Sequence, residues 1–547
     1  MNVDIYLGNT FFPWNKTENN NIKCWLKGDL FYNNKILNGS DVISLYSSIS
    51  YDSKNINDIL KDFLLGFNGS FALVIETTDN ILCVVDRVRS IPLFYSINSA
   101  RLTISDDANY IKDHIFPSLN EINCAEFLVT GYVTGSETLF DGIWQIQSGE
   151  FLFYTKYERK ISVYRYFSYL HGDYSDETEE QLIKRLDKVI VSVFNRLIDT
   201  TIKQGKVIVV PLSGGLDSRL IVSMLKRLGV KDVICFSYGR KKNREAEISK
   251  RVAEALGYPW YFVEYSNKKW YDFYNSDEMR AYEQYAGNLA SLPVIQDFLA
   301  VKILKEEGKL PDNAVFVPGH SGDFLAGSYI PLDYNATQNF SIETFLKETR
   351  KKHYFLWEWD YEAKKNSVLN QKIKSLTNEI LICDSESYVT CVNFFVFSEK
   401  VAKFVVNSVR LYEFFGYGWR IPLWDTELMD FFLHTPLYLR LNQDLYIKYA
   451  FNEVFKEELK ILSQIPCTTS KESLSQESLR TYIFRIIPLS PIIKRKIFLQ
   501  YKIKTEYSSH PLNWHSIMSE DEFKSWYSGY QTINSFLTKK YLKRFTK

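Results

Sequence analysis

Apolar residues in the first part of the chain fall in short runs separated by turn residues, a pattern that predicts β-strands. Residues 69–76 and 81–86 are two such runs, and the polar residues 77–80 between them are typical of a hairpin turn. A further strand is expected at residues 93–96, and another pair of strands near residues 150–166. The pattern therefore predicts a β-rich unit at the start of the chain.

An acidic and polar stretch at residues 173–180 interrupts this pattern and predicts the start of a helix. Acidic residues in a first turn interact favourably with the helix dipole. The apolar residues that follow recur at helical spacing: Leu182, Leu186, Val189, Val193 and Leu197. We therefore expect the domain boundary at about residues 168–176.

After this helix the chain alternates between apolar strands and amphipathic helices. Residues 206–212 form a continuous apolar run, as expected for a parallel strand that is covered on both faces. An amphipathic helix that ends at Gly229 follows, and a second strand and helix are expected at residues 233–237 and about 244–256. This order predicts a doubly wound α/β sheet. Beyond about residue 335 the chain is expected to be mainly helical.

Composition and charge argue against a nucleic-acid-binding protein and against a cysteine-bound metal. The chain has 547 residues, enough for two or three domains, and its 66 Lys and Arg nearly balance its 65 Asp and Glu. This balance gives no basic field that would favour nucleic acid as a partner. The 7 cysteines lack metal-ligand spacing, and their odd number favours a reducing compartment.

No signal peptide and no apolar stretch of about 18 residues is evident, so we expect a cytoplasmic protein without membrane contact. The basic stretch at residues 494–496 is interpreted as the solvated side of a packed helix, and contact with a membrane surface is the alternative.

The segment Ser213-Gly214-Gly215-Leu216-Asp217-Ser218 lies between the expected strand and the next helix. Its two glycines allow a sharp turn with unobstructed amides, and the helix N-terminus points at the same place. Together these features predict a cradle for a phosphate chain. Asp217 would repel a bare phosphate, which indicates that Mg²⁺ lies between them. The alternative is a Gly-Gly turn with an Asp that caps the helix.

This loop resembles the synthetase domain of the asparagine synthetase family, whose Ser-Gly-Gly-Leu-Asp-Ser motif is matched at every position. Residues 236–239 look like the family's adenine-binding strand end, and residues 319–327 look like its second loop. Arg410 and residues 420–425 look like a region that helps to shape the site. The resemblance implies ATP and Mg²⁺ as cofactors, with Asp217 and Asp323 as metal ligands. It implies these ATP-binding residues: Leu212, Ser213, Gly214, Gly215, Asp217, Ser218, Tyr238 and Gly319.

The same resemblance implies two catalytic residues. Such enzymes present a Lys to the developing negative charge, and Lys471 is the best match, with Lys448 as its competitor and an ordinary surface charge as the alternative for either. His320 replaces the Glu of the family's second loop. A histidine can deprotonate an ammonium-type nucleophile near neutral pH. A His at this place also occurs in relatives similar to lasso-peptide cyclases, and a capping or hydrogen-bonding role is the alternative.

Residues 67–72, 86–95 and 131–143 resemble the glutaminase domain of the same family. Working relatives carry a Cys directly after the initiator Met, whose free amine serves as general base. Position 2 is Asn2, and Cys24 lies inside a segment expected to be a strand. We therefore expect that this domain does not hydrolyse glutamine, so that nitrogen comes from ammonia, a separate glutaminase or an amine of the substrate.

The predicted architecture combines these interpretations. Residues 1–168 are expected to form a catalytically silent αββα domain of the Ntn-hydrolase type. Residues 176–475 are expected to form a doubly wound parallel α/β domain similar to the adenine-nucleotide α-hydrolases, and residues 476–547 a helical extension. A homodimer stays open.

The sequence is compatible with four functions. The leading one is an AMP-forming ligase that adenylates a carboxylate and forms an amide with ammonia or an amine. Its substrate is a small molecule or a glycan, with a uronic acid of a surface polysaccharide as a candidate, because residues 318–323 look like those of asparagine-synthetase-like proteins of such pathways. The alternatives are asparagine synthesis, intramolecular amide closure as in β-lactam synthetase and lasso-peptide cyclases, and a non-catalytic scaffold.

Overall fold

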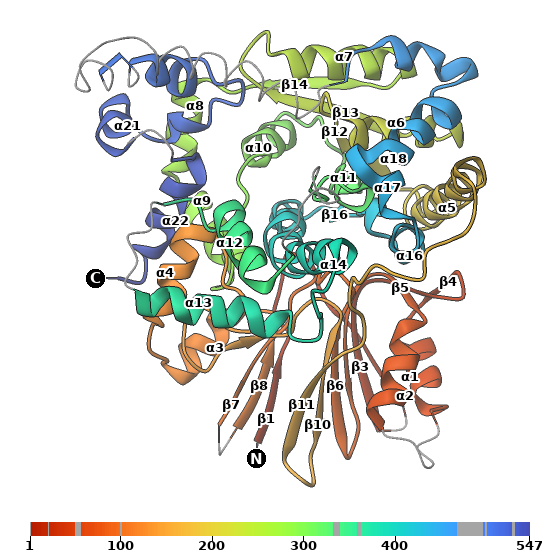
Figure 1. Ribbon diagram of the computed structural model, residues 1–547, viewed down its shortest axis with the longest axis vertical. Coiled ribbons are helices and arrows are strands. Elements are labelled where there is room, and N and C mark those ends of the chain that lie inside the picture. The colour runs from red at the N-terminus through yellow and green to blue at the C-terminus, as the bar shows by residue number, and fades with distance from the viewer. Residues whose placement is uncertain are drawn as a thin grey trace.

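The computed structural model describes residues 2–19, 21–49, 56–98, 101–331, 340–357, 363–467, 496–497, 500–527 and 531–546. The strands of the chain's first part gather at one end of the molecule, and the later strands and helices form the other end (Figure 1). Helix α22 (Ile533–Leu542), near the chain's C-terminal end, returns to pack against α4 (Glu121–Thr130) in the first part. We call the part up to Arg165 the β-rich unit and the part from Glu179 the α/β unit.

The β-rich unit contains two sheets with helices on their outer sides. The larger sheet has the strand order β11-β10-β6-β5-β3-β2, with β4 beside β3, and the smaller has the order β1-β8-β7-β9. Helices α1 and α3 pack on the larger and the smaller sheet, respectively. The bounds are β1 (Asn2–Tyr6), β2 (Asn15–Asn19), β3 (Ile22–Tyr32), β4 (Lys35–Leu37), β5 (Phe67–Glu76), β6 (Asn80–Val85), β7 (Phe94–Ile97), β8 (Arg101–Ser105), β9 (Trp144–Gln145), β10 (Glu150–Thr155), β11 (Lys160–Arg165), α1 (Gly39–Ser47), α2 (Ile56–Leu65) and α3 (Ala108–Ile115).

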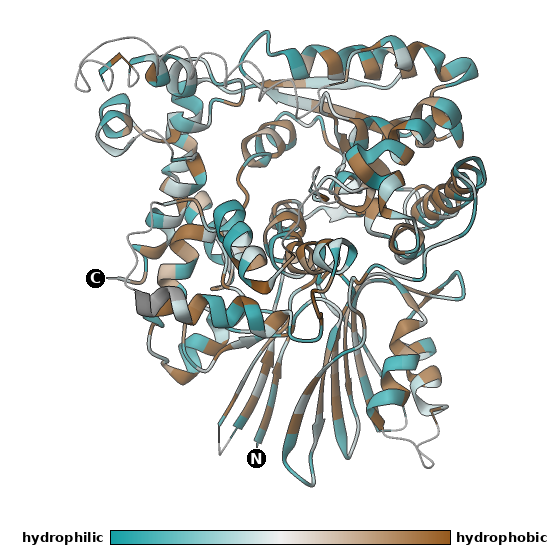
Figure 2. Ribbon diagram, viewed as in Figure 1, coloured by the Kyte–Doolittle hydropathy of each residue, from teal (hydrophilic) through white to brown (hydrophobic). Residues whose placement is uncertain are grey.

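The α/β unit is built on a parallel sheet with the strand order β14-β13-β12-β15-β16. Its strands are β12 (Val207–Pro211), β13 (Val233–Gly239), β14 (Trp260–Glu264), β15 (Ala314–Phe316) and β16 (Gly418–Trp419). Helices α5 (Glu179–Thr200), α6 (Leu216–Arg227) and α7 (Arg244–Leu256) connect or cover them. In Figure 2, α7 carries hydrophilic residues on its outer side and hydrophobic residues toward the sheet. The predicted α/β fold class is confirmed, including the hairpin of β5 and β6.

The rest of the α/β unit is mainly helical, as the sequence predicts. Within the described ranges, none of the helices combines the length and the apolar character needed to cross a lipid bilayer. The helices are α8 (Asn267–Tyr274), α9 (Asp277–Gly287), α10 (Phe298–Glu306), α11 (Gly322–Ala326), α12 (Ile342–His353), α13 (Ala363–Leu376), α14 (Ser385–Phe395), the π-helix η2 (Val396–Val405), η3 (Val406–Val409), α15 (Arg410–Phe414), η4 (Pro422–Trp424), α16 (Thr426–Leu433), α17 (Leu437–Arg440), η5 (Leu441–Gln443), α18 (Asp444–Tyr449), η6 (Ala450–Val454), η7 (Glu457–Gln464), η8 (Ile503–Ser508), η9 (Trp514–Ile517) and α21 (Glu520–Trp526).

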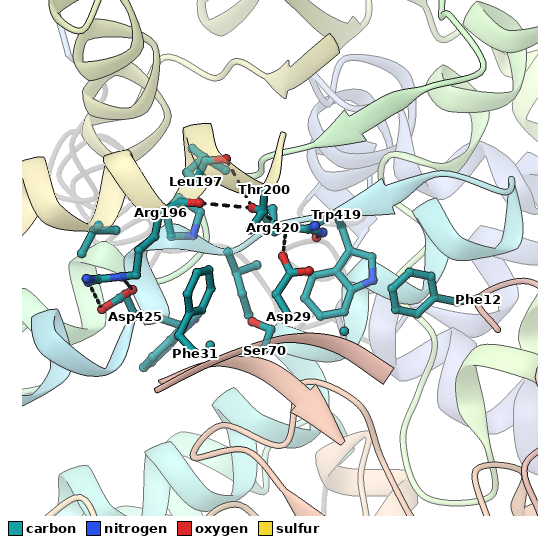
Figure 3. Close-up of a pocket in the computed structure, with 16 residues that line it drawn as sticks. Phe12, Asp29, Phe31, Ser70, Arg196, Leu197, Thr200, Trp419, Arg420 and Asp425 are labelled. Carbon is teal, nitrogen blue, oxygen red and sulfur yellow. Dashed lines mark hydrogen bonds and ion pairs between the residues drawn. The ribbon is translucent and has the colours of Figure 1, made fainter. Parts of the chain in front are cut away.

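Charged and polar side chains join the two units around a small cavity of about 50 Å³ (Figure 3). Arg196 of α5 binds Asp425 through two hydrogen bonds of 2.7 and 2.8 Å. Asn68 of β5 donates to the same carboxylate at 3.0 Å. Arg420 forms an ion pair with Asp29 of β3 across this cavity. Most of the residues 420–425 that sequence resemblance assigns to the shape of the site therefore line this interface, whereas Leu423 packs at Gly322 of the second loop.

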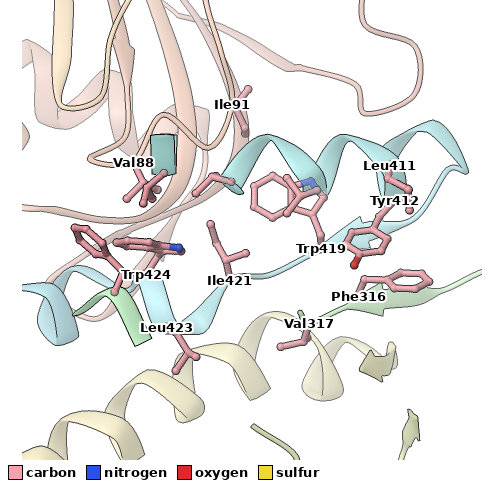
Figure 4. Packing of buried hydrophobic residues seen from close by; sticks show 14 of the residues in the cluster. Val88, Ile91, Phe316, Val317, Leu411, Tyr412, Trp419, Ile421, Leu423 and Trp424 are labelled. Carbon is pink, nitrogen blue, oxygen red and sulfur yellow. The ribbon is translucent and has the colours of Figure 1, made fainter. Parts of the chain in front are cut away.

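Apolar side chains seal the same interface. Figure 4 shows Val88 and Ile91 of the β-rich unit close to Trp419, Ile421 and Trp424 of the α/β unit. All five are 4 % exposed or less, so the interface is as dry as a domain core. An interface of this kind holds the two units in one arrangement.

Candidate active site

The predicted phosphate cradle lies where the sequence places it, between β12 and α6. Helix α6 begins at Leu216, two residues before Ser218, and Gly215 at its N-cap position offers no side chain to cap it. The first-turn amides of a helix have no partner within the helix, so they are available to an anion. Ser218 Oγ accepts from the backbone N–H of Ser213 at 3.1 Å, and Ser213 Oγ accepts from that of Gly215 at 3.2 Å. These hydroxyls hold the loop in shape.

The second loop comes to the same edge of the sheet because β15 is the parallel neighbour of β12. Gly319 packs against the start of α6, where a Cβ atom would lie 2.6 Å from the backbone nitrogen of Ser218. At Gly322 a Cβ atom would lie 2.9 Å from Asp217 Oδ1. Only residues without a side chain allow the two loops to approach this closely.

The two aspartates assigned to metal binding are in contact here. The backbone N–H of Asp323 donates to Asp217 Oδ2 at 3.1 Å, and the Tyr446 hydroxyl donates to Asp217 Oδ1 at 3.0 Å. Burial and the nearby Asp323 charge raise the pKa of Asp217 to about 7. Burial also raises the pKa of Asp323, opposed by a hydrogen bond from Ser328. Neighbouring carboxylates in a partly desolvated site attract a cation.

The donor set fits a magnesium ion that is shared with a nucleotide. The described part of the chain contains no group of three or more His, Cys, Asp or Glu side chains that could hold a metal by themselves. Mg²⁺ is commonly bound through one or two carboxylates while phosphate oxygens and water complete the octahedron. Asp217 and Asp323, beside the phosphate cradle, are two such carboxylates.

A cavity of about 300 Å³ opens from the cradle along the carboxyl ends of the strands. Of the predicted residues, Ser213, Ser218, Tyr238, Gly319 and His320 line it. Gly214 and Gly215 belong to the cradle loop. Leu212 is 1 % exposed, and its backbone N–H donates to the Phe236 carbonyl at 2.9 Å, so its side chain lies in the core behind the cavity.

Several lining residues carry no sequence signal. Asp297, just before α10, accepts hydrogen bonds from the hydroxyls of Tyr238 and, at 2.9 Å, of Tyr412. Burial raises the pKa of this carboxyl group, and the two hydroxyls oppose the rise. Phe404 and Ser408 come from the helical segment η2–η3, far away in the chain. Only the folding of distant segments brings these side chains to the cavity.

His320 lines the cavity, where its ring lies next to the Ser408 hydroxyl. Ser408 Oγ lies 3.3 Å from Nε2 of the ring and donates its own proton to the Val405 carbonyl at 2.7 Å. Burial lowers the pKa of His320 to about 4, so the ring is neutral at neutral pH. The site therefore presents a neutral imidazole, and its basicity is lower than that expected for a solvated histidine.

Of the two candidate lysines, the structure describes only Lys448. Lys448 is on the outer side of α18, where Nζ pairs with Asp444 at 2.7 Å and with Glu179 at 2.9 Å. Lys471 lies outside the described residues. Lys400 of η2, which sequence reasoning missed, binds the Tyr329 hydroxyl at 3.0 Å, and its charge acts on Asp323. Lys400 thus supplies a cation near the carboxylate pair.

Replacing Gly319 by Ala is expected to weaken ATP binding by about 10-fold, since the added methyl group pushes the second loop away from Ser218 and such overpacking costs about 1–3 kcal/mol. The measurement is the Kd of a non-hydrolysable ATP analogue. Gly418→Ala is the matched control, because its Cβ atom would meet the nearest atom at an ordinary 3.5 Å. Equal affinities for both variants would show that the two loops separate freely.

Comparison with known proteins places these residues within a family pattern. A family model described as asparagine synthase matches residues 192–461, which include both loops of the cavity. Over 339 residues the chain is 22 % identical to the microcin J25-processing protein McjC of Escherichia coli. That match covers 60 % of this chain and 57 % of the relative, so the chain spans little more than half of the relative's length.

Two solved structures have low similarity to the chain. The chain shares 14 % identity with a glutamine phosphoribosylpyrophosphate amidotransferase from B. subtilis, over 46 % of this chain and 72 % of that one, with a TM-score of 0.20. It shares 12 % identity with an NH3-dependent NAD synthetase from Campylobacter jejuni, over 38 % of this chain and 99 % of that one, also with a TM-score of 0.20. The fold assignment rests on the topology of the two units themselves.

Proposed function

We propose that the chain, whose residues 192–461 match a family model described as asparagine synthase, is an ATP-dependent ligase that adenylates a carboxylate and converts it to an amide. The observation that carries this proposal is the meeting of Asp217 and Asp323 beside an uncapped helix N-terminus, at the edge of a parallel sheet. That arrangement binds a polyphosphate through amides on one side and through a carboxylate-held cation on the other. When bound there, Mg²⁺ would neutralise phosphate charge.

In the first step the substrate carboxylate attacks the α-phosphorus of ATP. An O–P bond forms, the bond between the α-phosphorus and its bridging oxygen breaks, and pyrophosphate leaves with the electron pair. The amides at the start of α6 and the hydroxyls of Ser213 and Ser218 bind the leaving phosphates. Lys400 adds a positive charge on the Asp323 side of the site.

In the second step an amine or ammonia attacks the acyl carbon of the adenylate, and AMP leaves as the C–N bond forms. The attacking nitrogen must lose a proton. His320 lines the cavity with a neutral ring that is a weak base, and it is placed to accept this proton once the forming C–N bond has made the nitrogen more acidic. Lys471 is the lysine proposed to meet the negative charge in this step, since Lys448 pairs with Glu179 and Asp444 instead.

Candidate carboxylates are a uronic acid of a surface polysaccharide, aspartate, and a carboxylate within a molecule that also carries the amine. The test is pyrophosphate release from ATP and Mg²⁺ in the presence of each carboxylate with ammonium. Release that depends on both a carboxylate and a nitrogen donor supports a ligase. A complete lack of release with correctly bound ATP would favour the scaffold alternative.

We also propose that residues 1–168 form a silent glutaminase-like domain, joined to a synthetase domain at 176–475 and an extension at 476–547. Incubation of the purified protein with glutamine is expected to release no glutamate above background. Cys24 is fully buried in β3, and burial raises the pKa of its thiol to about 12, so it is neither accessible nor ionised. Cys124, on α4, has a thiol pKa raised to about 11 by burial.

The control is the same assay after Cys24→Ser, which should give an identical background. Steady glutamate release that Cys24→Ser removes would overturn this part of the proposal. Without glutaminase activity, nitrogen comes from ammonia, from a separate glutaminase or from an amine of the substrate.

A further inference from the structure

We propose that an apolar cavity beside the nucleotide site, lined in part by Trp514, Ile533 and Leu537, binds an apolar group of the carboxylate substrate that also carries a hydrogen-bond acceptor, as in a peptide or an N-acyl amino acid. This inference rests on the proposed function and names the substrate class of the same site.

This cavity is apolar and has the size of one aromatic side chain. Its volume is about 130 Å³. Cavities of about 150 Å³ with apolar linings bind benzene. No charged side chain of the described chain is among the residues that line it, which are Trp270, Pro293, Val294, Ile295, Gln296, Phe404, Trp514, Ile533, Asn534 and Leu537.

This apolar cavity adjoins the cavity of about 300 Å³ beside the phosphate cradle, which we call the nucleotide cavity. Val294, Gln296 and Phe404 line both of them. A carboxylate that reaches the α-phosphorus from the nucleotide cavity can therefore place the rest of its molecule past Phe404 into the apolar space. The two cavities together form an extended site with a phosphate end at Ser213 and an apolar end at Trp514.

The indole N–H of Trp514 indicates that the bound group carries a hydrogen-bond acceptor. Trp514 Nε1 is buried and has no hydrogen-bond partner within the described ranges. A buried indole N–H usually finds a partner, so a ligand acceptor such as an amide carbonyl fits this place. A sugar would bring several hydroxyl groups into a lining that offers few polar partners, and each unpaired hydroxyl costs binding free energy. The lining therefore favours an apolar acyl or peptide group over a uronic acid.

Four of the ten residues that line this cavity lie beyond the part that matches the family model. The match ends at residue 461, whereas Trp514 and Leu537 lie well beyond it. Two hydrogen bonds hold the residues just before Trp514 against the α/β unit. Trp270 Nε1 donates to the Leu512 carbonyl at 3.2 Å, and Asn513 donates to the Tyr265 carbonyl at 2.9 Å. One side of the cavity is thus formed by residues that follow the matched range in the chain.

The test is equilibrium binding of two probes, N-acetyl-phenylalanine and glucuronic acid, to the full chain with a non-hydrolysable ATP analogue and Mg²⁺. N-acetyl-phenylalanine is expected to bind at least about 10-fold more tightly, because its ring removes apolar surface from water. Leu537→Trp should fill the cavity and remove this preference without changing the affinity for the ATP analogue. Leu381→Trp is the matched control, since Leu381 is 82 % exposed.

Trp514→Phe keeps an aromatic wall but removes the N–H, and it should weaken the N-acetyl-phenylalanine complex by about 3- to 10-fold. This variant serves if Leu537→Trp does not fold. Equal or tighter binding of glucuronic acid, or no effect of either variant, would overturn the inference. A loss of nucleotide binding in Leu537→Trp would also overturn it and assign the cavity to the adenine ring. Probe binding needs no catalysis, so intact binding without pyrophosphate release would count against the proposed function alone.

Discussion

Replacing Asp217 by Asn is expected to reduce ATP-dependent pyrophosphate release by at least about 100-fold. Asp217 meets Asp323 beside the phosphate cradle, and the two carboxylates are the donors that would hold a cation against the phosphates. The amide of Asn keeps the shape of the side chain and its hydrogen bond from Tyr446 but removes the negative charge. The cation would then be bound more weakly, and the negative charge of the phosphates in the transition state would no longer be neutralised.

The fold should survive this change. Asp217 is largely desolvated and lies close to another carboxylate, so removal of its charge relieves repulsion. We expect the variant to unfold at a temperature no lower than that of the wild type in the absence of Mg²⁺. Asp312→Asn, at an exposed position, is the matched control and should leave both activity and stability unchanged. Full activity in the Asp217 variant would show that the metal assignment is wrong.

Replacing Asp425 by Ala is expected to lower the free energy of unfolding by about 3–5 kcal/mol. The change removes both hydrogen bonds of Arg196 to this carboxylate and leaves a buried guanidinium with Glu427 as its remaining acidic partner. It also removes the cap on the first turn of α16 and the contact with Asn68 of the β-rich unit. Urea unfolding followed by fluorescence measures the loss.

Asp199→Ala tests whether the effect belongs to the interface. Asp199 is on the same helix as Arg196, but its ion pair with Lys203 is exposed, so we expect a change within about 0.5 kcal/mol. Combining Arg196→Met with Asp425→Leu should recover much of the stability, since apolar residues can replace a buried ion pair. A loss in Asp425→Ala no larger than that of the control would mean that this pair does not hold the two units together.

Local sequence patterns predicted the elements that carry the cradle. The apolar run before Ser213 becomes β12, and the helix after it begins at Leu216 as the glycines allow. Both features depend on neighbouring residues only, because strand character and helix starts are governed by short-range periodicity and backbone freedom. The motif resemblance also paired Asp217 with Asp323, and the structure brings them together.

Long-range packing decided the rest of the site. Lys448 looks suitable in sequence, but its position on α18 turns it toward Glu179, because residues two apart on a helix face different sides. Tyr446 of the same helix reaches Asp217 instead. The direction of a side chain depends on how its helix is packed, which no local pattern encodes.

By itself, the sequence determined the α/β class, because strand and helix periodicity depends on neighbouring residues. It also predicted a phosphate cradle and a pair of metal-binding carboxylates, through short motifs that resemble those of a known family. Only the tertiary structure decided that Asp297, Phe404 and Trp514 line one connected site, since their segments are distant in the chain and meet through packing. It likewise decided that His320 is neutral, because burial depends on everything that surrounds the ring.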